Sequence, residues 1–229
     1  MLLRCGAWVW AEAQQRTFLY GRIIMTTYLY DSQKSSKLSM KNIKLGKYLS
    51  LNDFCTCTNT YRKYSDKINP YPDSKESIQA LKNLNFYIID PVIDYFSLAK
   101  FKLTYGFCSH ELRIYLDKKD PITGLKNGRV APKLDQHIAH ELKKNGEYYC
   151  QRLGAACDFL ILDLDSDQLV DWILKQQLPF DSLYFYGKNQ PIHISYGPQH
   201  KRDIWTFTAT GKPTQKGIEL WIKTAKEFL

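Results

Sequence analysis

The chain has 229 residues, of which 44% are hydrophobic and 24% charged, the ordinary composition of one substantial soluble globular domain. Its formal net charge of +9 favours a polyanionic partner such as nucleic acid, although scattered solvated lysines would give the same balance. No run of about eighteen apolar residues is present, which excludes a membrane-spanning helix, and the six cysteines without a convincing export signal predict a cytoplasmic protein with reduced thiols.

The first 47 residues show no clear amphipathic period, so residues 1–47 are expected to be poorly ordered or to form a basic arm. The last part of this segment carries five lysines and no acidic residue: Lys34, Lys37, Lys41, Lys44 and Lys47. Met25 is a second candidate start, so residues 1–24 are a candidate over-extension of the chain. The sequence therefore predicts a single folded domain at residues 48–229.

The first regular elements are a helix and a strand. Asp73 is predicted to cap the helix, with Glu76 as its reciprocal partner three residues on. An apolar stripe at helical spacing follows, made of Ile78, Leu81, Leu84 and Ile88. Pro91 is expected to end or kink this helix. Residues 101–107 then alternate in the manner of a strand.

The second half of the sequence contains two more predicted helices before its last strands. One is expected to begin near Pro132 and to stop at Gly146, and the other runs from Ser166 to Leu178. Between them, residues 155–162 alternate as a strand that places Asp158 on the face opposite Cys157. Further strands are predicted at residues 183–186, 192–196 and 204–208, before a final helix at residues 215–228. Helices followed by short strands with short turns predict an α+β domain with an antiparallel sheet and helices on one side.

Four short sequence motifs resemble those of a known family. They are Leu49–Phe54 (LSLNDF), Ile89–Ile93 (IDPVI), Gln151–Phe159 (QRLGAACDF), and Pro179–Leu183 (PFDSL) followed by Pro191–Tyr196 (PIHISY). In this order the segment from about residue 49 to residue 207 resembles the zinc D-Ala-D-Ala carboxypeptidases of the hedgehog/DD-peptidase fold. The resemblance implies one zinc ion held by two histidines and an aspartate, with an open position for an activated water.

Carried over residue by residue, the resemblance implies that Asp158 and His193 are two of the three zinc ligands. Arg152 stands where the first histidine belongs, and a guanidinium cannot ligate zinc because it has no free lone pair. Gln190 stands where the family has a general-base glutamate, and Cys108 replaces an arginine that grips substrate. The expected zinc ligand, general base and substrate-binding arginine are thus all replaced. These three replacements predict that the chain is not an ordinary cell-wall peptidase.

Two other histidines are candidates for the missing ligand. His137 and His140 would lie one turn apart on the helix predicted from Pro132, and Glu141 would lie beside His137 as a candidate catalytic base. The alternative is that both histidines lie on the solvated side of that helix. The first interpretation predicts a divergent zinc hydrolase with a rebuilt site.

A second interpretation needs no metal. Arg152, beside Asp158 and His193, would bind a carboxylate or phosphate, unless it forms a structural ion pair with Asp158. His110, after the first predicted strand, and Arg202, in a basic turn, are further candidate substrate or anion contacts. This interpretation predicts a catalytically inactive accessory or binding module for an anionic ligand such as nucleic acid.

Overall fold

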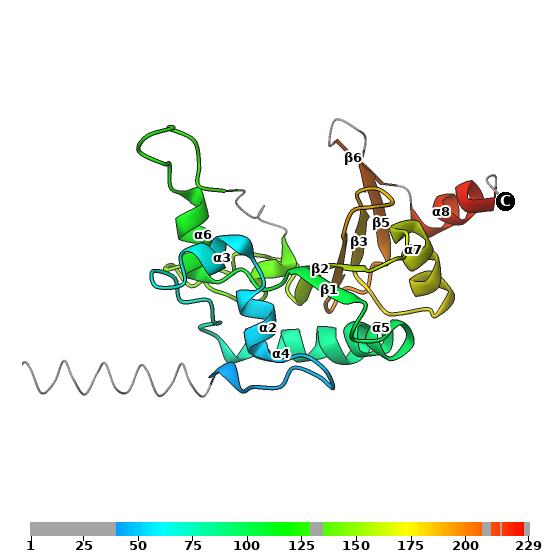
Figure 1. Ribbon diagram of the computed structural model, residues 1–229, viewed down its shortest axis with the longest axis horizontal. Helices are drawn as coiled ribbons and strands as arrows, with labels where there is room; N and C mark the ends of the chain where they lie inside the picture. The colour runs from blue at the N-terminus through cyan, green and yellow to red at the C-terminus, as the bar shows by residue number, and fades with distance from the viewer. Residues whose placement is uncertain (1–39, 129–134, 208–211, 216, 227–229) are drawn as a thin grey trace, which may run out of the picture. The chain divides into compact units, whose positions relative to one another are not determined.

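A six-stranded sheet organises the part of the chain that this computed structural model describes, which is residues 40–128, 135–207, 212–215 and 217–226 (Figure 1). The strands are β1 (Phe101–Tyr105), β2 (Ala155–Ile161), β3 (Ser182–Phe185), β4 (Ile192–Tyr196), β5 (Asp203–Phe207) and β6 (Pro213–Gln215). The compact unit to which they belong runs from Asn42 to Leu229. Most of the predicted basic arm, and the candidate start at Met25, lie outside the described residues.

The sheet is mixed, so the predicted purely antiparallel sheet is wrong. The strand order is β1-β2-β4-β3-β5-β6, and every neighbouring pair is antiparallel except β3 and β5. The exception follows from the pairing of β4, which has β2 on one edge and β3 on the other. When the chain reverses after β4, both edges of β4 are occupied, and β5 pairs at the outer edge of β3. Because β3 and β5 both run against β4, they run parallel to each other.

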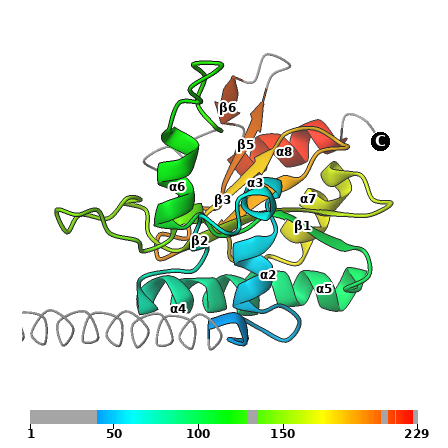
Figure 2. The same cartoon turned by 60° about the vertical axis from the view of Figure 1, so that its left-hand side comes forward.

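One face of the sheet is covered by helices (Figure 2). They are α4 (Lys75–Leu84), the π-helix η1 (Asn85–Ile89), α5 (Asp90–Phe96), α7 (Ser166–Lys175) and α8 (Gly217–Lys226). Tyr87 of η1 stacks on Tyr196 of β4 with ring centroids 4.8 Å apart, and Trp221 of α8 packs edge-on against Phe185 of β3 at 5.1 Å. None of the helices in the described residues is long and apolar enough to cross a membrane.

Pro91 does not end the helix, so of the two predicted outcomes the end is wrong. The π-helix η1 continues directly from α4, and Pro91 falls in the first turn of α5. A proline there lacks an amide N–H to donate, and the wider π turn before it changes the local hydrogen-bond register. The cap also differs, since the N-cap is Ser74, whose side chain accepts a hydrogen bond from Ser77 N, rather than Asp73.

Three short helices of this unit lie near one another (Figure 1). They are α2 (Leu51–Thr56), α3 (Asn59–Lys63) and α6 (His110–Asp117). Their packing involves the rings of Tyr64 and Tyr115, whose centroids are 4.6 Å apart, and buried Leu112. A backbone hydrogen bond from Phe107 N to Phe54 O ties α2 to the segment that follows β1.

The alternation of β2 and β4 separates the core from the functional face. Cys157 and Phe159 of β2, and Ile192 and Ile194 of β4, are completely buried under the helices. The intervening residues point to the other face. This alternation was predicted for β2, and it fixes the positions of the polar side chains described next. The cysteines among the described residues are free thiols.

Candidate metal centre

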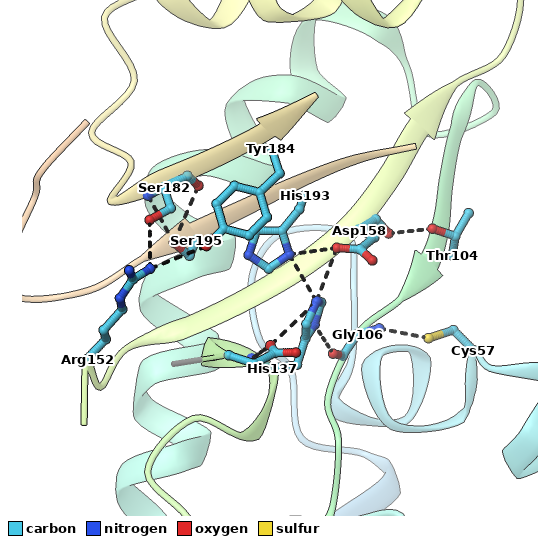
Figure 3. Close-up of polar contacts among 11 residues, drawn as sticks. Cys57, Thr104, Gly106, His137, Arg152, Asp158, Ser182, Tyr184, His193 and Ser195 are labelled. Atoms are coloured by element: carbon cyan, nitrogen blue, oxygen red, sulfur yellow. Dashed lines mark hydrogen bonds and ion pairs between the residues drawn. The ribbon is translucent and has the colours of Figure 1, made fainter. Parts of the chain in front are cut away.

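Three side chains bring one ligand atom each to a common point (Figure 3). His193 Nδ1 lies 2.8 Å from Asp158 Oδ1, and His137 Nε2 lies 3.1 Å from each of these two atoms. His137 and His193 are buried, and the Asp158 side chain is 26% exposed. The group is therefore a triangle of two buried imidazole nitrogens and one carboxylate oxygen, and the carboxylate belongs to the most exposed of the three side chains.

The sheet places two of these residues side by side. Asp158 of β2 and His193 of β4 are direct cross-strand partners in the antiparallel register. Directly opposite residues have Cβ atoms about 4.5–5.5 Å apart on the same face, which lets both side chains reach one point. A slip of one residue in this pairing would turn one of the two side chains to the helical face.

His137 arrives from a different kind of element than predicted. It lies in a one-turn 3-10 helix, η2 (Gln136–Ile138), which ends at Ala139 rather than continuing to Gly146. The expected helix from Pro132 is therefore wrong over its described part, and residues 129–134 lie outside the described residues. Leu142, which falls within the predicted helix, is 47% exposed. The short turn suffices because Asp135 accepts a hydrogen bond from His137 N and begins η2.

A backbone carbonyl sets the orientation of the His137 ring. His137 Nδ1 lies 2.8 Å from the carbonyl oxygen of Gly106, which can only accept, so Nδ1 carries a proton. In the neutral ring the lone pair is then on Nε2, aimed at Asp158 and His193. Metal-binding histidines commonly have such a carbonyl on the other ring nitrogen. Gly106 is itself held through its amide, which donates to the sulfur of Cys57 at 3.2 Å.

This arrangement can hold a cation. Asp158 Oδ1 only accepts, and the proton of His193 Nδ1 satisfies it at 2.8 Å. The lone pair of His137 Nε2 would then face a carboxylate oxygen at 3.1 Å with no hydrogen between them. A proton on Nε2 or a metal ion among the three atoms removes that repulsion. A zinc ion with bonds of about 2.0–2.1 Å and near-tetrahedral angles spaces its ligands by about 3.3 Å, close to the separations seen here.

The charges around His137 favour its protonated form when no metal is bound. Burial opposes the charge, but the carboxylates of Asp135 and Asp158 and the hydrogen bonds to Asp158 and Gly106 outweigh burial and raise the pKa of His137 to about 9. Burial also disfavours the Asp158 carboxylate, yet the charge of His137 and the hydrogen bonds from both histidines hold its pKa well below the ordinary range. The site is thus built to keep Asp158 ionised, as a metal ligand must be.

Two tyrosines enclose the histidine rings. Tyr184 of β3 lies flat on His193 with ring centroids 4.5 Å apart and 19° between the planes (Figure 3). Tyr105 of β1 lies edge-on to His137 at 4.5 Å. These rings restrict the rotation of both imidazoles, so the ligand atoms stay aimed at the common point.

The structure places His140 and Glu141 away from the three ligand atoms. His140 Nε2 accepts the Gly154 amide hydrogen bond at 3.0 Å, and burial lowers the pKa of the ring, which keeps it neutral as an acceptor. Glu141 is 2% exposed, and its carboxylate accepts hydrogen bonds from the start of α4. The structure therefore does not bring His140 and Glu141, the predicted ligand and base, to the three ligand atoms, because both side chains hydrogen-bond to other groups.

The candidate anion contacts are also separated. Arg152 donates to Ser182 Oγ and to the Tyr184 hydroxyl, each at 3.3 Å, and does not form the alternative ion pair with Asp158 (Figure 3). His110 begins α6 and lies against the ring of Tyr149. Arg202 donates to the carbonyls of Gln177 and Leu178, which makes it a structural residue of that turn. Of these candidates, only Arg152 lies near the three ligand atoms in the described contacts. It hydrogen-bonds to Tyr184, whose ring stacks on His193.

Sequence reasoning missed Gly106, Tyr184 and Asp135 as parts of this centre. Gly106 contributes only backbone atoms, so no side-chain pattern could reveal it. Tyr184 follows from the register of β3 with β4, in which it is the direct partner of His193. Asp135 sits two residues before His137, and its carboxylate lies 4.0 Å from the Nε2 atom of that ring. An acid two residues before a predicted histidine ligand was the one available signal.

Comparisons of the chain with models of protein families, with curated proteins and with solved structures gave no match.

Proposed function

We propose that this chain is a zinc-binding protein of the metallohydrolase type, distantly related to the zinc D-Ala-D-Ala carboxypeptidases. His137, Asp158 and His193 are its three ligands. The observation that carries the proposal is the lone pair of His137 Nε2, fixed by the Gly106 carbonyl and aimed at two other ligand atoms. Two imidazoles and one carboxylate are a donor set found in catalytic zinc sites, which leave a position for water.

A zinc ion at this point would polarise a substrate carbonyl and lower the pKa of a bound water. The protein's own residues orient the ligands and restrict water. Tyr184 and Tyr105 cover the two imidazole rings, and the half-open side of Asp158 leaves an approach. Three positions with a functional role in the family carry a different residue here, namely Arg152, Cys108 and Gln190. These differences support a substrate other than a D-Ala-D-Ala peptide.

Zinc titration tests the proposal. We expect one zinc ion per chain, with an affinity that rises as the pH is raised toward about 9, because the proton on His137 must leave before Nε2 can bind the metal. The rise is about tenfold per pH unit while one proton is displaced. Metal content of the purified protein and calorimetric titration between pH 6.5 and pH 8.5 measure both quantities. Folded protein that takes up no zinc at any of these pH values would contradict the proposal.

A second candidate function is the binding of an anionic ligand, and the position of Arg152 favours it. Its guanidinium has five N–H donors, and the two described contacts, both from Nη1, are long. No carboxylate in the described residues forms an ion pair with it. Ser182 and Tyr184 beside it offer hydroxyl donors, so an anion here would meet three polar groups next to the metal centre.

We expect Arg152→Gln to weaken the binding of a fluorescent single-stranded DNA by at least about tenfold at low salt, the loss expected for one charge-assisted hydrogen bond. The affinity of the unsubstituted chain should fall steeply between about 50 and 200 mM salt. Lys144→Gln, which removes one exposed charge from a turn, is the matched control and should leave the affinity nearly unchanged. Equal binding by both variants, or binding that ignores salt, would rule out this candidate.

A further inference from the structure

The turn that follows His137 has an uncommon backbone. Ala139 ends η2 with φ 49° and ψ −124°, and its side chain is completely buried. A residue with a Cβ atom rarely adopts this conformation, which persists only where the surroundings enforce it. Because Ala139 lies two residues after His137, the conformation of this turn determines where the His137 ring points.

The first restraint on the turn is Glu141. One of its carboxylate oxygens accepts hydrogen bonds from Ser77 Oγ at 2.7 Å and from Ser74 N at 3.3 Å, and the other accepts from Asp73 N at 3.1 Å. Ser77 Oγ in turn accepts a hydrogen bond from His140 N at 3.1 Å. A buried carboxylate with three donors from the first turn of α4 fixes this end of the turn to the helical layer.

The second restraint is the ring of His140. Its Nε2 accepts the amide hydrogen of Gly154, the residue immediately before β2. Asp158 is four residues further along the same segment. The hydrogen bond therefore connects the turn that carries one candidate ligand with the strand that carries another.

We propose that His140 and Glu141 are positioning residues, which hold the strained turn at Ala139 and so aim His137 Nε2 at Asp158 and His193. The inference rests on the proposed function, in that the aimed atom is a zinc ligand. Without the two restraints the turn relaxes toward an ordinary helical or extended conformation, and the His137 ring moves away from the other two ligand atoms. Residues that support metal ligands in this way typically change metal affinity by about 10- to 100-fold when they are replaced.

The test compares zinc affinity with fold stability in five variants. His140→Leu and Glu141→Gln should each still bind one zinc ion, with a dissociation constant about 10- to 100-fold higher than that of the unsubstituted chain. His140→Gln retains an acceptor for Gly154 N–H and should recover part of the affinity. Ile173→Ala removes a buried side chain of α7 on the helical face and is the control for destabilisation alone, so its zinc affinity should be unchanged.

Zinc affinity is measured by competition with a chelator, and stability by urea unfolding of the metal-free proteins. A zinc dissociation constant that stays at the unsubstituted value in His140→Leu and Glu141→Gln, while their stability falls as in Ile173→Ala, would overturn the inference. If the larger changes prevent folding, Ser77→Ala gives a milder variant. It removes the Ser77 Oγ donor to Glu141 and the acceptor of His140 N, so its zinc affinity should fall in the same way. An unsubstituted chain that binds no zinc would instead overturn the proposed function together with the inference.

Discussion

Replacing Asp158 with alanine is expected to abolish zinc binding and to leave the domain folded. Asp158 Oδ1 is the only anionic ligand atom of the three and contacts both histidines, so its loss removes the charge that balances the ion. At a zinc concentration about a thousand times the dissociation constant, the bound ion stabilises the native state by about 4 kcal/mol. That increment should be absent in the variant. Thermal unfolding with and without zinc measures it.

The matched control for this experiment is His200→Asn. His200 is an exposed histidine with φ 42°, a backbone conformation that asparagine tolerates well. The substitution removes one imidazole that is not part of the metal centre. Zinc should therefore stabilise this variant as much as the unsubstituted chain. If zinc raises the unfolding temperature of Asp158→Ala as much as that of His200→Asn, the ion is bound elsewhere.

Replacing Gly154 with alanine is expected to destabilise the domain by about 3 kcal/mol, the sum of left-handed strain and overpacking. Gly154 has φ 79°, and a Cβ atom there would lie 2.2 Å from Tyr196 O and 2.5 Å from Gly197 Cα. Both are backbone atoms next to the end of β4, so the strand pair must separate to make room. The register that brings Asp158 beside His193 starts at this point, so zinc affinity should fall as well.

Gly124→Ala separates the two causes of this destabilisation, which are backbone strain and overpacking. Gly124 has φ 67°, and a Cβ atom there would meet nothing within 4 Å, so only the backbone strain of about 1–2 kcal/mol remains. Urea unfolding of both variants gives the difference that is due to the backbone clash. Equal losses of unfolding free energy in the two variants would show that the close approach of Gly154 to β4 is unimportant.

The sequence predicts the parts of the centre that depend on local alternation. The period of two in β2 and β4 places Asp158 and His193 on one face, and the structure pairs them. The spacing of His137 and His140 resembles one helical turn, but Gln136–Ile138 form a single 3-10 turn, and the strained Ala139 directs the two rings to different partners. That conformation depends on contacts with the rest of the fold, which the local pattern does not contain.

Glu141 shows why the function of a charged residue was hard to predict. An acid next to a histidine has the pattern of a catalytic base, but the donors of this carboxylate are 64 to 68 residues away in sequence, at the start of α4. The parallel pair of β3 and β5 has a similar origin, because it depends on which edges of β4 are already occupied. Both features are set by long-range packing, so they can be recognised only from the assembled sheet and not from the local sequence.

The wide sequence separation of the three ligand residues has a kinetic consequence. His137 and Asp158 are 21 residues apart, and Asp158 and His193 are 35 residues apart on paired strands. The centre therefore exists only after non-local strand pairing is complete, and such pairing is intrinsically slow. An ion that binds there stabilises the native state but not a transition state in which these strands are still unpaired. It would lengthen the lifetime of the folded domain by slowing its unfolding, with little effect on the rate at which the chain folds.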